Sequence, residues 1–314
     1  MKERILITGG AGFIGTHLAK AYSENGYQVT VIDLQGPSEL IPNVKYFRGD
    51  VRKESDLAGL ISTHDAVFHW AAIVSVPDCQ KDPVGSYETN TISTLKVLDL
   101  IRTENAQRPS DRKIKILFSS SSAVYGESGN SGEPISESNP LPEPISFYGA
   151  QKLASEQLIR LYSKAYGIPA VVFRFFNVFG PGQKANSPYS GVISLFTKNV
   201  RSDQELRLNG AGAPTRDFIS VHDLVRACVA GQKSRNPDVC SGAPINLGSG
   251  EAIAIKNLAK MLFEISDKLE KTVDAPARDG DILHSRADIS RARTLLDWQP
   301  HLQLKDALQE LLNS

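Results

Sequence analysis

The sequence predicts an α/β protein with a Rossmann-type, doubly wound parallel sheet and a smaller, discontinuous C-terminal lobe. Three observations predict this fold. Short β-branched runs alternate with longer helical patterns, a glycine-rich turn follows the first run, and the alternation stops after Arg174. Alternation at this spacing implies right-handed crossovers between parallel strands. The 314 residues suffice for about two domains.

The elements follow one another regularly up to Arg174. The expected strands span residues 5–8, 28–32, 44–47, 66–69, 114–118 and 170–173. The expected helices span residues 14–25, 54–61, 84–104 and 147–166. The last of these ends at Gly167, which suits the position after a helix, and Pro169 cannot continue it. Surface loops are expected at 107–113 and 127–144.

The second half of the chain has a different pattern. Residues 175–190 are rich in Gly, Pro and Asn and are interpreted as a crossing into the second lobe. The segment 217–247 resembles a helix and strand that return to the sheet, and the tail resembles separate helices. We therefore expect residues 1–174, with a return segment at about 217–248, to form one domain. Residues 175–216 and 249–314 are expected to form the lobe.

Composition excludes several classes of function. With 35 Lys+Arg and 35 Asp+Glu the formal net charge is zero, which argues against a nucleic acid or a membrane surface as partner. Cys79, Cys228 and Cys240 show no metal-like spacing, so neither a metal site nor disulfides are expected. No apolar run approaches the roughly 18 residues of a membrane span, and no signal-peptide pattern precedes the first strand. We expect a cytoplasmic protein.

The glycine-rich turn is the first candidate site. Gly10, Gly12 and Gly15 fit the pattern G-x-G-x-x-G, and Gly9 replaces Gly10 in a related three-spaced form. Glycines permit a tight turn and let backbone N–H groups approach a pyrophosphate at a helix N-terminus. Asp33 ends the second strand, where a carboxylate accepts hydrogen bonds from ribose and repels a 2′-phosphate. The pattern predicts NAD rather than NADP; the alternative is an ordinary turn followed by a solvated carboxylate.

A tyrosine and a lysine form the second candidate site. Tyr148 and Lys152 stand one helical turn apart. They lie roughly 140° around the helix from its apolar stripe, so we expect them to avoid that face and point into a cleft. The stripe consists of Ala154, Leu158, Leu161 and Ala165. The lysine ammonium and a nicotinamide cation would lower the tyrosine pKa, and Ser121 could hydrogen-bond a substrate oxygen. The alternatives are an exposed aromatic beside a solvated lysine and a strand-end serine.

Together these motifs resemble the extended short-chain dehydrogenase/reductase family over nearly the whole chain. The matching segments are residues 8–15, 33, 49–51, 69–72, 119–126, 148–152, 175–177, 216–218 and 246–248. The resemblance implies that Ser121, Tyr148 and Lys152 form the catalytic group. It implies NAD contacts from Gly9, Gly12, Phe13, Ile14, Gly15, Asp33, Asp50, Val51, Ala71, Ala72, Asn90, Ser119, Tyr148, Lys152 and Phe176.

Within that family the chain is most similar to the nucleotide-sugar 4-epimerases. The resemblance implies epimerisation at C4 of a UDP-hexose through a transient 4-keto sugar, and we expect a homodimer. The implied substrate contacts are Ser75, Ser121, Tyr148, Asn177, Val192, Asn209, Arg216, Arg278, Asp281 and Ser285. Two arginines suit a diphosphate, and a carboxylate suits ribose hydroxyls; for Arg278 and Asp281 the alternative is a surface salt bridge.

Departures from related enzymes narrow the reaction. Dehydratases of the family carry an Asp-Glu pair before Val-Tyr-Gly and decarboxylases carry a Glu, whereas this chain has Ser122 and Ala123. No cysteine is evident near Ser121, unlike in the GDP-fucose-type epimerase-reductases. Two alternatives stay open. One is another NAD-dependent nucleotide-sugar enzyme, such as a UDP-glucuronate epimerase, a decarboxylase or a dehydratase. The other is a non-catalytic NAD-binding regulatory protein.

The resemblance also implies which sugar is accepted. In these epimerases the residue four positions after the Asp of Arg-x-Gly-Asp lines the sugar pocket near C2, and here it is Ser285. A tyrosine at that place restricts the pocket to glucose and galactose, whereas a small residue leaves room for an N-acetyl group. UDP-GlcNAc and UDP-GalNAc are therefore the expected substrates, with UDP-Glc and UDP-Gal also accepted. The alternative is a serine that only begins the next segment.

Overall fold

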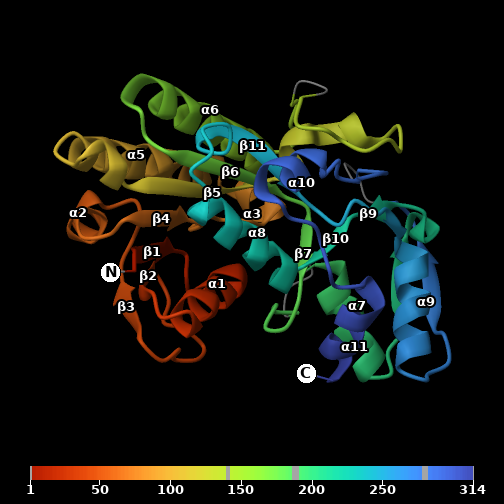
Figure 1. Ribbon diagram of the computed structural model, residues 1–314. Coiled ribbons are helices and arrows are strands. Elements are labelled where there is room, and N and C mark those ends of the chain that lie inside the picture. Colours follow the sequence, from red (N-terminus) through yellow and green to blue (C-terminus); the bar gives the residue numbers. More distant parts are fainter. Residues whose placement is uncertain (1, 139–141, 186–190, 278–281, 314) are drawn as a thin grey trace.

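A seven-stranded parallel sheet forms the centre of the molecule, in the order β11-β6-β5-β4-β1-β2-β3 (Figure 1). The computed structural model describes residues 2–138, 142–185, 191–277 and 282–313. The sheet strands are β1 (Arg4–Thr8), β2 (Gln28–Asp33), β3 (Val44–Arg48), β4 (Ala66–His69), β5 (Lys115–Ser121), β6 (Ala170–Phe175) and β11 (Ser241–Leu247). The strand order reverses between β1 and β4, which is the Rossmann arrangement and confirms the predicted fold class.

Helices cover both faces of this sheet. One face carries α1 (Phe13–Glu24), α8 (Val221–Lys233) and α10 (Ser290–Leu296), and the other carries α2 (Glu54–Ser62), α5 (Ser93–Asn105) and α6 (Phe147–Tyr166). Side chains of β1 alternate between the two layers: Ile5 and Ile7 pack beneath α1, whereas Leu6 packs beneath α2 and α5. This alternation explains why the strands are apolar throughout rather than at every second residue.

The lobe has a hydrophobic cluster of its own, at the lower right of Figure 1. It contains α7 (Val192–Arg201), α9 (Ile255–Ile265), α11 (Leu304–Asn313), β8 (Leu206–Asn209), β13 (Thr272–Ala275), β9 (Thr215–Arg216), β12 (Ile253–Ala254), β7 (Asn177–Phe179) and β10 (Phe218–Ser220). As expected, α8 and β11 return to the sheet. The tail is shared, because Ala292, Leu296 and Trp298 pack with the sheet, whereas Leu308 packs in the lobe. The division into two domains at the expected boundaries stays a prediction.

Several elements differ from the expected ones. The helix expected at 84–104 consists of α4 (Pro83–Tyr87), a π-helical turn at Glu88–Ile92 and α5. The fifth strand extends to Ser121, and α3 (Val76–Lys81) was not expected. The loop expected at 107–113 contains a 3₁₀ turn at Ser110–Arg112, and the 3₁₀ turn Ser122–Gly129 extends into the start of the loop expected at 127–144. Within the described residues, no helix combines the length and hydrophobicity that a membrane span requires.

Tyr148 and Lys152 of α6 line a cavity, as expected, but the apolar stripe of this helix is not its buried face. Leu161 of the apolar stripe is 62% exposed, whereas Lys152 is only 2% exposed. The buried face consists of Gly149, Gln151, Lys152, Ser155, Glu156 and Ile159. The polar side chains among them, Gln151, Lys152, Ser155 and Glu156, are buried because each has a hydrogen-bonding partner beneath the helix. The hydrophobicity pattern alone could not reveal this buried face, because it assigns leucine to the buried side of a helix and glutamate to the exposed side.

Candidate active site

The turn from β1 into α1 is built from glycines that allow close backbone contacts. Gly9 has a φ of 70°, and a Cβ there would lie 2.7 Å from the Ala71 backbone nitrogen. A Cβ on Gly15 would lie 2.5 Å from the Gly9 carbonyl oxygen. No side chain of the described residues caps α1 at Gly12, and its first turn carries no acidic residue. The N–H groups and the positive end of the helix dipole are therefore available to an anion.

A cavity of about 530 Å³ extends from this turn along the carboxyl ends of the strands. It is lined by all three predicted catalytic residues and by every predicted cofactor contact except Asn90. These residues are Gly9, Gly12, Phe13, Ile14, Gly15, Asp33, Asp50, Val51, Ala71, Ala72, Ser119, Ser121, Tyr148, Lys152 and Phe176. The two candidate sites of the sequence are thus two parts of one cavity.

Two carboxylates line the part of the cavity beyond β2. One oxygen of Asp33 accepts a hydrogen bond from the Ala11 backbone N–H at 3.1 Å. Asp50 is held in a fork by Arg52, with N–O distances of 3.0 and 2.7 Å, and this ion pair lowers the pKa of Asp50. Both groups are therefore fixed in place by the chain, and an ionised carboxylate can only accept hydrogen bonds.

Ser121, Tyr148 and Lys152 meet at the other part of the cavity. The Lys152 Nζ donates a hydrogen bond to the Ser119 carbonyl oxygen at 2.7 Å and lies 5.9 Å from the centre of the Tyr148 ring. The Ser121 hydroxyl is hydrogen-bonded to Tyr148. Its oxygen also accepts from the Ala123 backbone N–H at 3.1 Å. The arrangement places a phenol, a hydroxyl and an ammonium around one point, which suits proton transfer to or from a substrate hydroxyl.

Burial dominates the protonation of this pair. Loss of solvent raises the pKa of Tyr148 to about 12, and the hydrogen bond with Ser121 acts in the opposite direction. Loss of solvent lowers the pKa of Lys152 to about 7, against the attraction of Glu156. The expected lowering of the Tyr148 pKa by the lysine is therefore not produced by the chain itself, because desolvation of a phenolate is the larger effect. A cation delivered beside the ring would counteract that burial.

Asn90 lies behind the cavity wall rather than in it. Its side-chain oxygen accepts from the Ile73 backbone N–H at 2.7 Å, and its amide donates to the Ile73 carbonyl at 2.9 Å and to Gln151 at 2.7 Å. Asn90 is not among the residues that line the cavity, and its expected place near the cofactor phosphates stays a prediction. The Asn90 side chain fixes the wall segment at Ile73 and Val74, which line the cavity.

Six of the expected substrate contacts are not in the lining of this cavity: Ser75, Asn177, Val192, Asn209, Arg216 and Ser285. Ser75 caps α3, Val192 begins α7, Asn209 ends β8, Arg216 lies on β9, and Ser285 is buried. The Asn177 amide donates to the Asp217 carbonyl at 3.0 Å. Arg278 and Asp281 lie outside the described residues.

Asp217 is a residue whose role the sequence did not suggest. Its buried carboxylate accepts hydrogen bonds from the backbone N–H groups of Ser249, Gly250 and Ala287, and from the Ser249 hydroxyl. It therefore ties β10 to the turn after β11 and to the segment that carries Ser285. Its position beside Arg216 in a matched motif was the only signal.

Cys79 lies close to the catalytic group, although no cysteine positioned for acid–base chemistry was expected beside Ser121. The thiol influences the protonation of both Tyr148 and Lys152. It is completely buried, however, and donates to the Ile73 carbonyl oxygen at 3.4 Å, and burial raises its pKa. Because a buried, protonated thiol is a poor acid–base group, its chemistry differs from that of a reactive cysteine.

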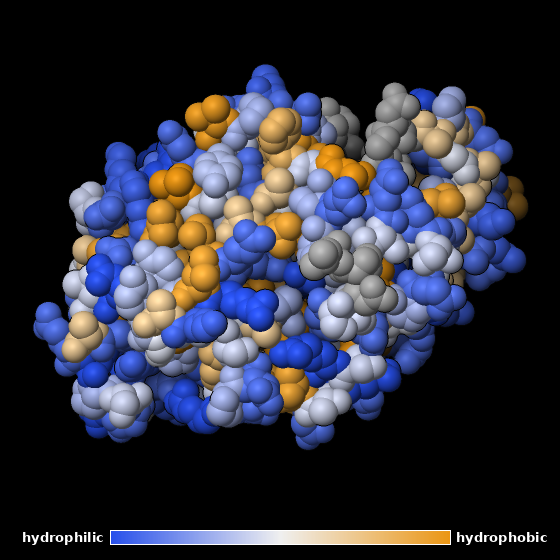
Figure 2. All heavy atoms as spheres, turned by 90° about the horizontal axis from the view of Figure 1, so that it is seen from above, coloured by the Kyte–Doolittle hydropathy of each residue, from blue (hydrophilic) through white to orange (hydrophobic). Residues whose placement is uncertain are grey.

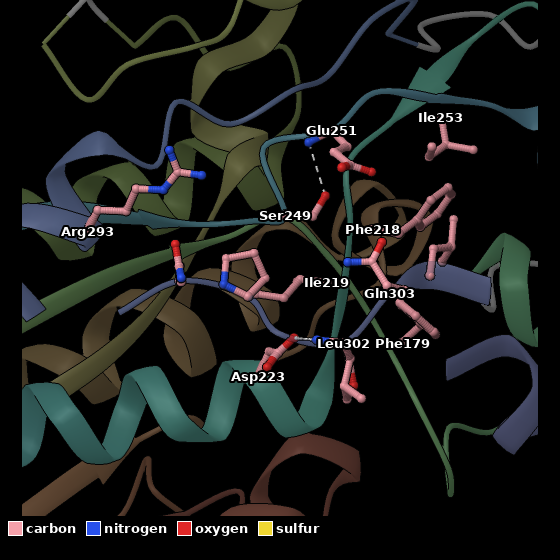
Figure 3. A pocket seen from close by; sticks show the side chains of 14 residues that line it. Phe179, Phe218, Ile219, Asp223, Ser249, Glu251, Ile253, Arg293, Leu302 and Gln303 are labelled. Carbon is pink, nitrogen blue, oxygen red and sulfur yellow. Dashed lines mark hydrogen bonds between the residues drawn. The ribbon is translucent and has the colours of Figure 1, made fainter. Parts of the chain in front are cut away.

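A second cavity of about 170 Å³ lies between β10, α8 and the tail (Figure 3). Asp223 is the buried carboxylate in its lining, and it already accepts from the backbone N–H groups of His301 and Leu302 and from Arg226. The other charged side chains, Glu251 and Arg293, are exposed at the rim. The hydrogen bonds of Asp223 thus attach the tail to α8 at this cavity.

The family model described as "NAD dependent epimerase/dehydratase family" matches residues 5–248. The chain belongs to this family. The match spans every strand of the sheet and all three predicted catalytic residues. NAD dependence, predicted from Asp33 and the glycine-rich turn, is thus confirmed for the family.

Known relatives of this epimerase/dehydratase chain cover it almost completely. A putative UDP-glucose 4-epimerase of Methanocaldococcus jannaschii is 32% identical over 98% of this chain and 97% of its own. The UDP-N-acetylglucosamine 4-epimerase of Methanobrevibacter ruminantium, solved with UDP-N-acetylmuramic acid, superposes with a TM-score of 0.88 at 30% identity, covering 100% and 98% of the two chains. The UDP-glucuronic acid 4-epimerase of Bacillus cereus, solved with UDP-glucuronic acid and NAD, has a TM-score of 0.86 at 32% identity, covering 99% and 98%.

The residues of this family member fit a dinucleotide. A Cβ at Gly12 would meet only the Gly9 carbonyl oxygen, at 3.2 Å, so the helix terminus is open toward the cavity. The carboxylate of Asp33 lies at the end of β2, where it can accept from ribose hydroxyls. Phe176 and Tyr148 line the same cavity as the glycine-rich turn and Asp33.

Proposed function

We propose that the chain interconverts the C4 epimers of a UDP-hexose, foremost UDP-GlcNAc and UDP-GalNAc, and also UDP-Glc and UDP-Gal. One observation carries the choice of reaction. Among the described residues that line the cavity, the carboxylates are Asp33 and Asp50, neither of them next to Tyr148. A dehydratase or decarboxylase needs a further acid beside the sugar, and Ser122 and Ala123 occupy the corresponding positions.

The chain's own groups then divide the work. Tyr148 removes the proton of the C4 hydroxyl. The ammonium group of Lys152 stabilises the phenolate form of Tyr148 that accepts this proton. Ser121 donates a hydrogen bond to the C4 oxygen as it becomes a carbonyl. Bound NAD supplies the hydride acceptor and donor at C4. The 4-keto sugar rotates in the site, and C4 regains its hydride on the other face. Tyr148 then gives its proton to the new C4 hydroxyl, so no net oxidation results.

A panel of UDP-sugars tests the reaction. The purified protein is incubated with UDP-GlcNAc, UDP-Glc, UDP-GlcA and dTDP-Glc, and the products are separated and weighed by mass spectrometry. We expect UDP-GalNAc and UDP-Gal at unchanged mass. Loss of carbon dioxide from UDP-GlcA or of water from any substrate would favour the alternative enzymes, and no conversion at all would favour a regulatory NAD-binding protein.

Cofactor choice gives a further prediction. We propose that Asp33 holds the adenosine ribose of NAD, so the purified protein carries NAD rather than NADP. Asp33→Ala should weaken NAD binding about 10- to 100-fold, the range for a lost hydrogen bond to a charged group. Nucleotide content after denaturation and calorimetric NAD binding measure this, with Glu54→Ala at an exposed position of α2 as control. An unchanged affinity, or NADP in the extract, would contradict it.

We also propose a homodimer that forms in the cytoplasm. Hydrophobic side chains gather in a broken band on the face that carries α5 and α6 (Figure 2). Val84, Leu161 and Tyr166 are exposed on the helices of this layer. Such a band is typical of subunit interfaces.

Light scattering should give twice the chain mass for the wild type and the single mass for Val84→Asp/Leu161→Asp. A wild-type monomer would refute the proposal. The cytoplasm suits the three free cysteines.

A further inference from the structure

Three successive serines of β5 each contact one of three residues spaced four apart on α6. The Ser119 carbonyl accepts from Lys152, the Ser120 hydroxyl donates to Glu156, and Ser121 is hydrogen-bonded to Tyr148. The contacts of Ser119 and Ser121 are with Lys152 and Tyr148, which line the cavity. The contact of Ser120 is with Glu156, which does not line it. This middle contact therefore has to be explained separately.

Glu156 is the centre of a buried ion pair behind the catalytic group. Arg174 on β6 donates to its two oxygens at 2.9 and 2.6 Å, and both side chains are almost fully buried. Ser120 and Arg174 are direct neighbours in the strand register, so one carboxylate clamps α6 to two adjacent strands. A shift of α6 along the sheet would break all these bonds together.

The surroundings of Lys152 leave Glu156 as its counter-charge. Three titratable groups interact with Lys152. They are Glu156 on the same helix, Cys79 on α3 and His69 on β4. Burial lowers the pKa of His69 to about 3 and raises that of Cys79, so both are neutral near pH 7. Among the described residues facing Lys152, Glu156 thus supplies the negative charge, one helical turn away.

We propose that Glu156 is a positioning residue for the reaction: it fixes the register of α6 against β5 and β6, and it keeps the side chain of Lys152 in its ammonium form beside Tyr148. The role in catalysis rests on the proposed function, whereas the effect on Lys152 does not. Arg174 completes the clamp and also packs 4.7 Å from the centre of the Tyr125 ring. The pair therefore links catalytic geometry to the packing of the sheet.

The test separates charge from folding. Glu156→Gln leaves Arg174 buried without a counter-ion and should lower the thermal unfolding midpoint strongly. The double variant Glu156→Gln/Arg174→Met removes both charges and should regain most of that midpoint. Asp99→Asn, which neutralises the exposed pair of Asp99 and Arg102, is the matched control.

Lysine labelled with ¹³C at Cε reports the titration of Lys152 by NMR in the purified holoenzyme, and Lys152→Met identifies its signal. We expect the titration midpoint to fall by about one pH unit in the double variant, and the alkaline limb of kcat/KM to move down with it. An unchanged midpoint in the stable double variant would overturn the proposal. If instead the midpoint falls but no UDP-sugar is converted by the wild type, the proposed function fails and the role of Glu156 in holding the Lys152 charge stands.

Discussion

Tyr148→Phe is expected to lower turnover at least ~10²-fold, the usual contribution of a general base. The substitution removes only the phenol oxygen, so the ring keeps its place in the cavity and the affinities for NAD and UDP should not change. The structure gives the reason for so large an effect. Beside Ser121, the other titratable side chain of the described cavity lining is Lys152, whose Nζ donates its hydrogen bond to the Ser119 carbonyl oxygen.

The measurement is the initial rate of epimerisation with saturating UDP-GlcNAc, together with calorimetric binding of UDP. Tyr162→Phe removes the same atom from the same helix outside the cavity and is the matched control. Near-normal turnover in Tyr148→Phe would remove Tyr148 from the mechanism. A loss of NAD from the variant would show that the phenol also holds the cofactor.

Local patterns are why most of the fold could be predicted from the sequence. The strands of the sheet are buried on both sides, so each one reads as a short apolar run whatever its neighbours are. Gly9 has a positive φ of 70°, and a Cβ on Gly15 would meet the Gly9 carbonyl oxygen, so both glycines are required by the turn itself. These features depend on short stretches of chain, so a single sequence displays them.

The features that the sequence did not show depend on distant partners. The buried face of α6 carries Lys152 and Glu156, and only Ser119, Ser120 and Arg174 make that burial favourable. In the same way, the sequence did not show that Asn90 hydrogen-bonds Ile73 and Gln151. The periodicity of hydrophobic residues along a helix contains no information about hydrogen-bonding partners on distant strands. Polar burial therefore emerges only from the assembled sheet.

Substrate breadth gives the second large effect, and it depends on Ser285. Its side chain is buried, and the segment that carries it is held from both sides: Leu283 binds Thr215 through the backbone, and Ala287 binds the Asp217 carboxylate. Because this segment cannot move away easily, a tyrosine placed there would fill the space that the resemblance to the epimerases assigns to the N-acetyl group. Ser285→Tyr should therefore abolish conversion of UDP-GlcNAc and spare conversion of UDP-Glc.

Rates with the two substrates, measured on one enzyme preparation, test this prediction, and the UDP-Glc rate serves as the internal standard for folding. Ser290→Tyr adds the same side chain at an exposed position of the same segment and should change neither rate. Ser285→Ala should keep both, since it leaves the space open and removes only a hydroxyl. Equal loss of both activities in Ser285→Tyr would mean that the residue supports the fold instead of the sugar pocket. Undiminished conversion of UDP-GlcNAc would place the N-acetyl group elsewhere, because a pocket already filled by a phenol ring cannot also hold an acetamide.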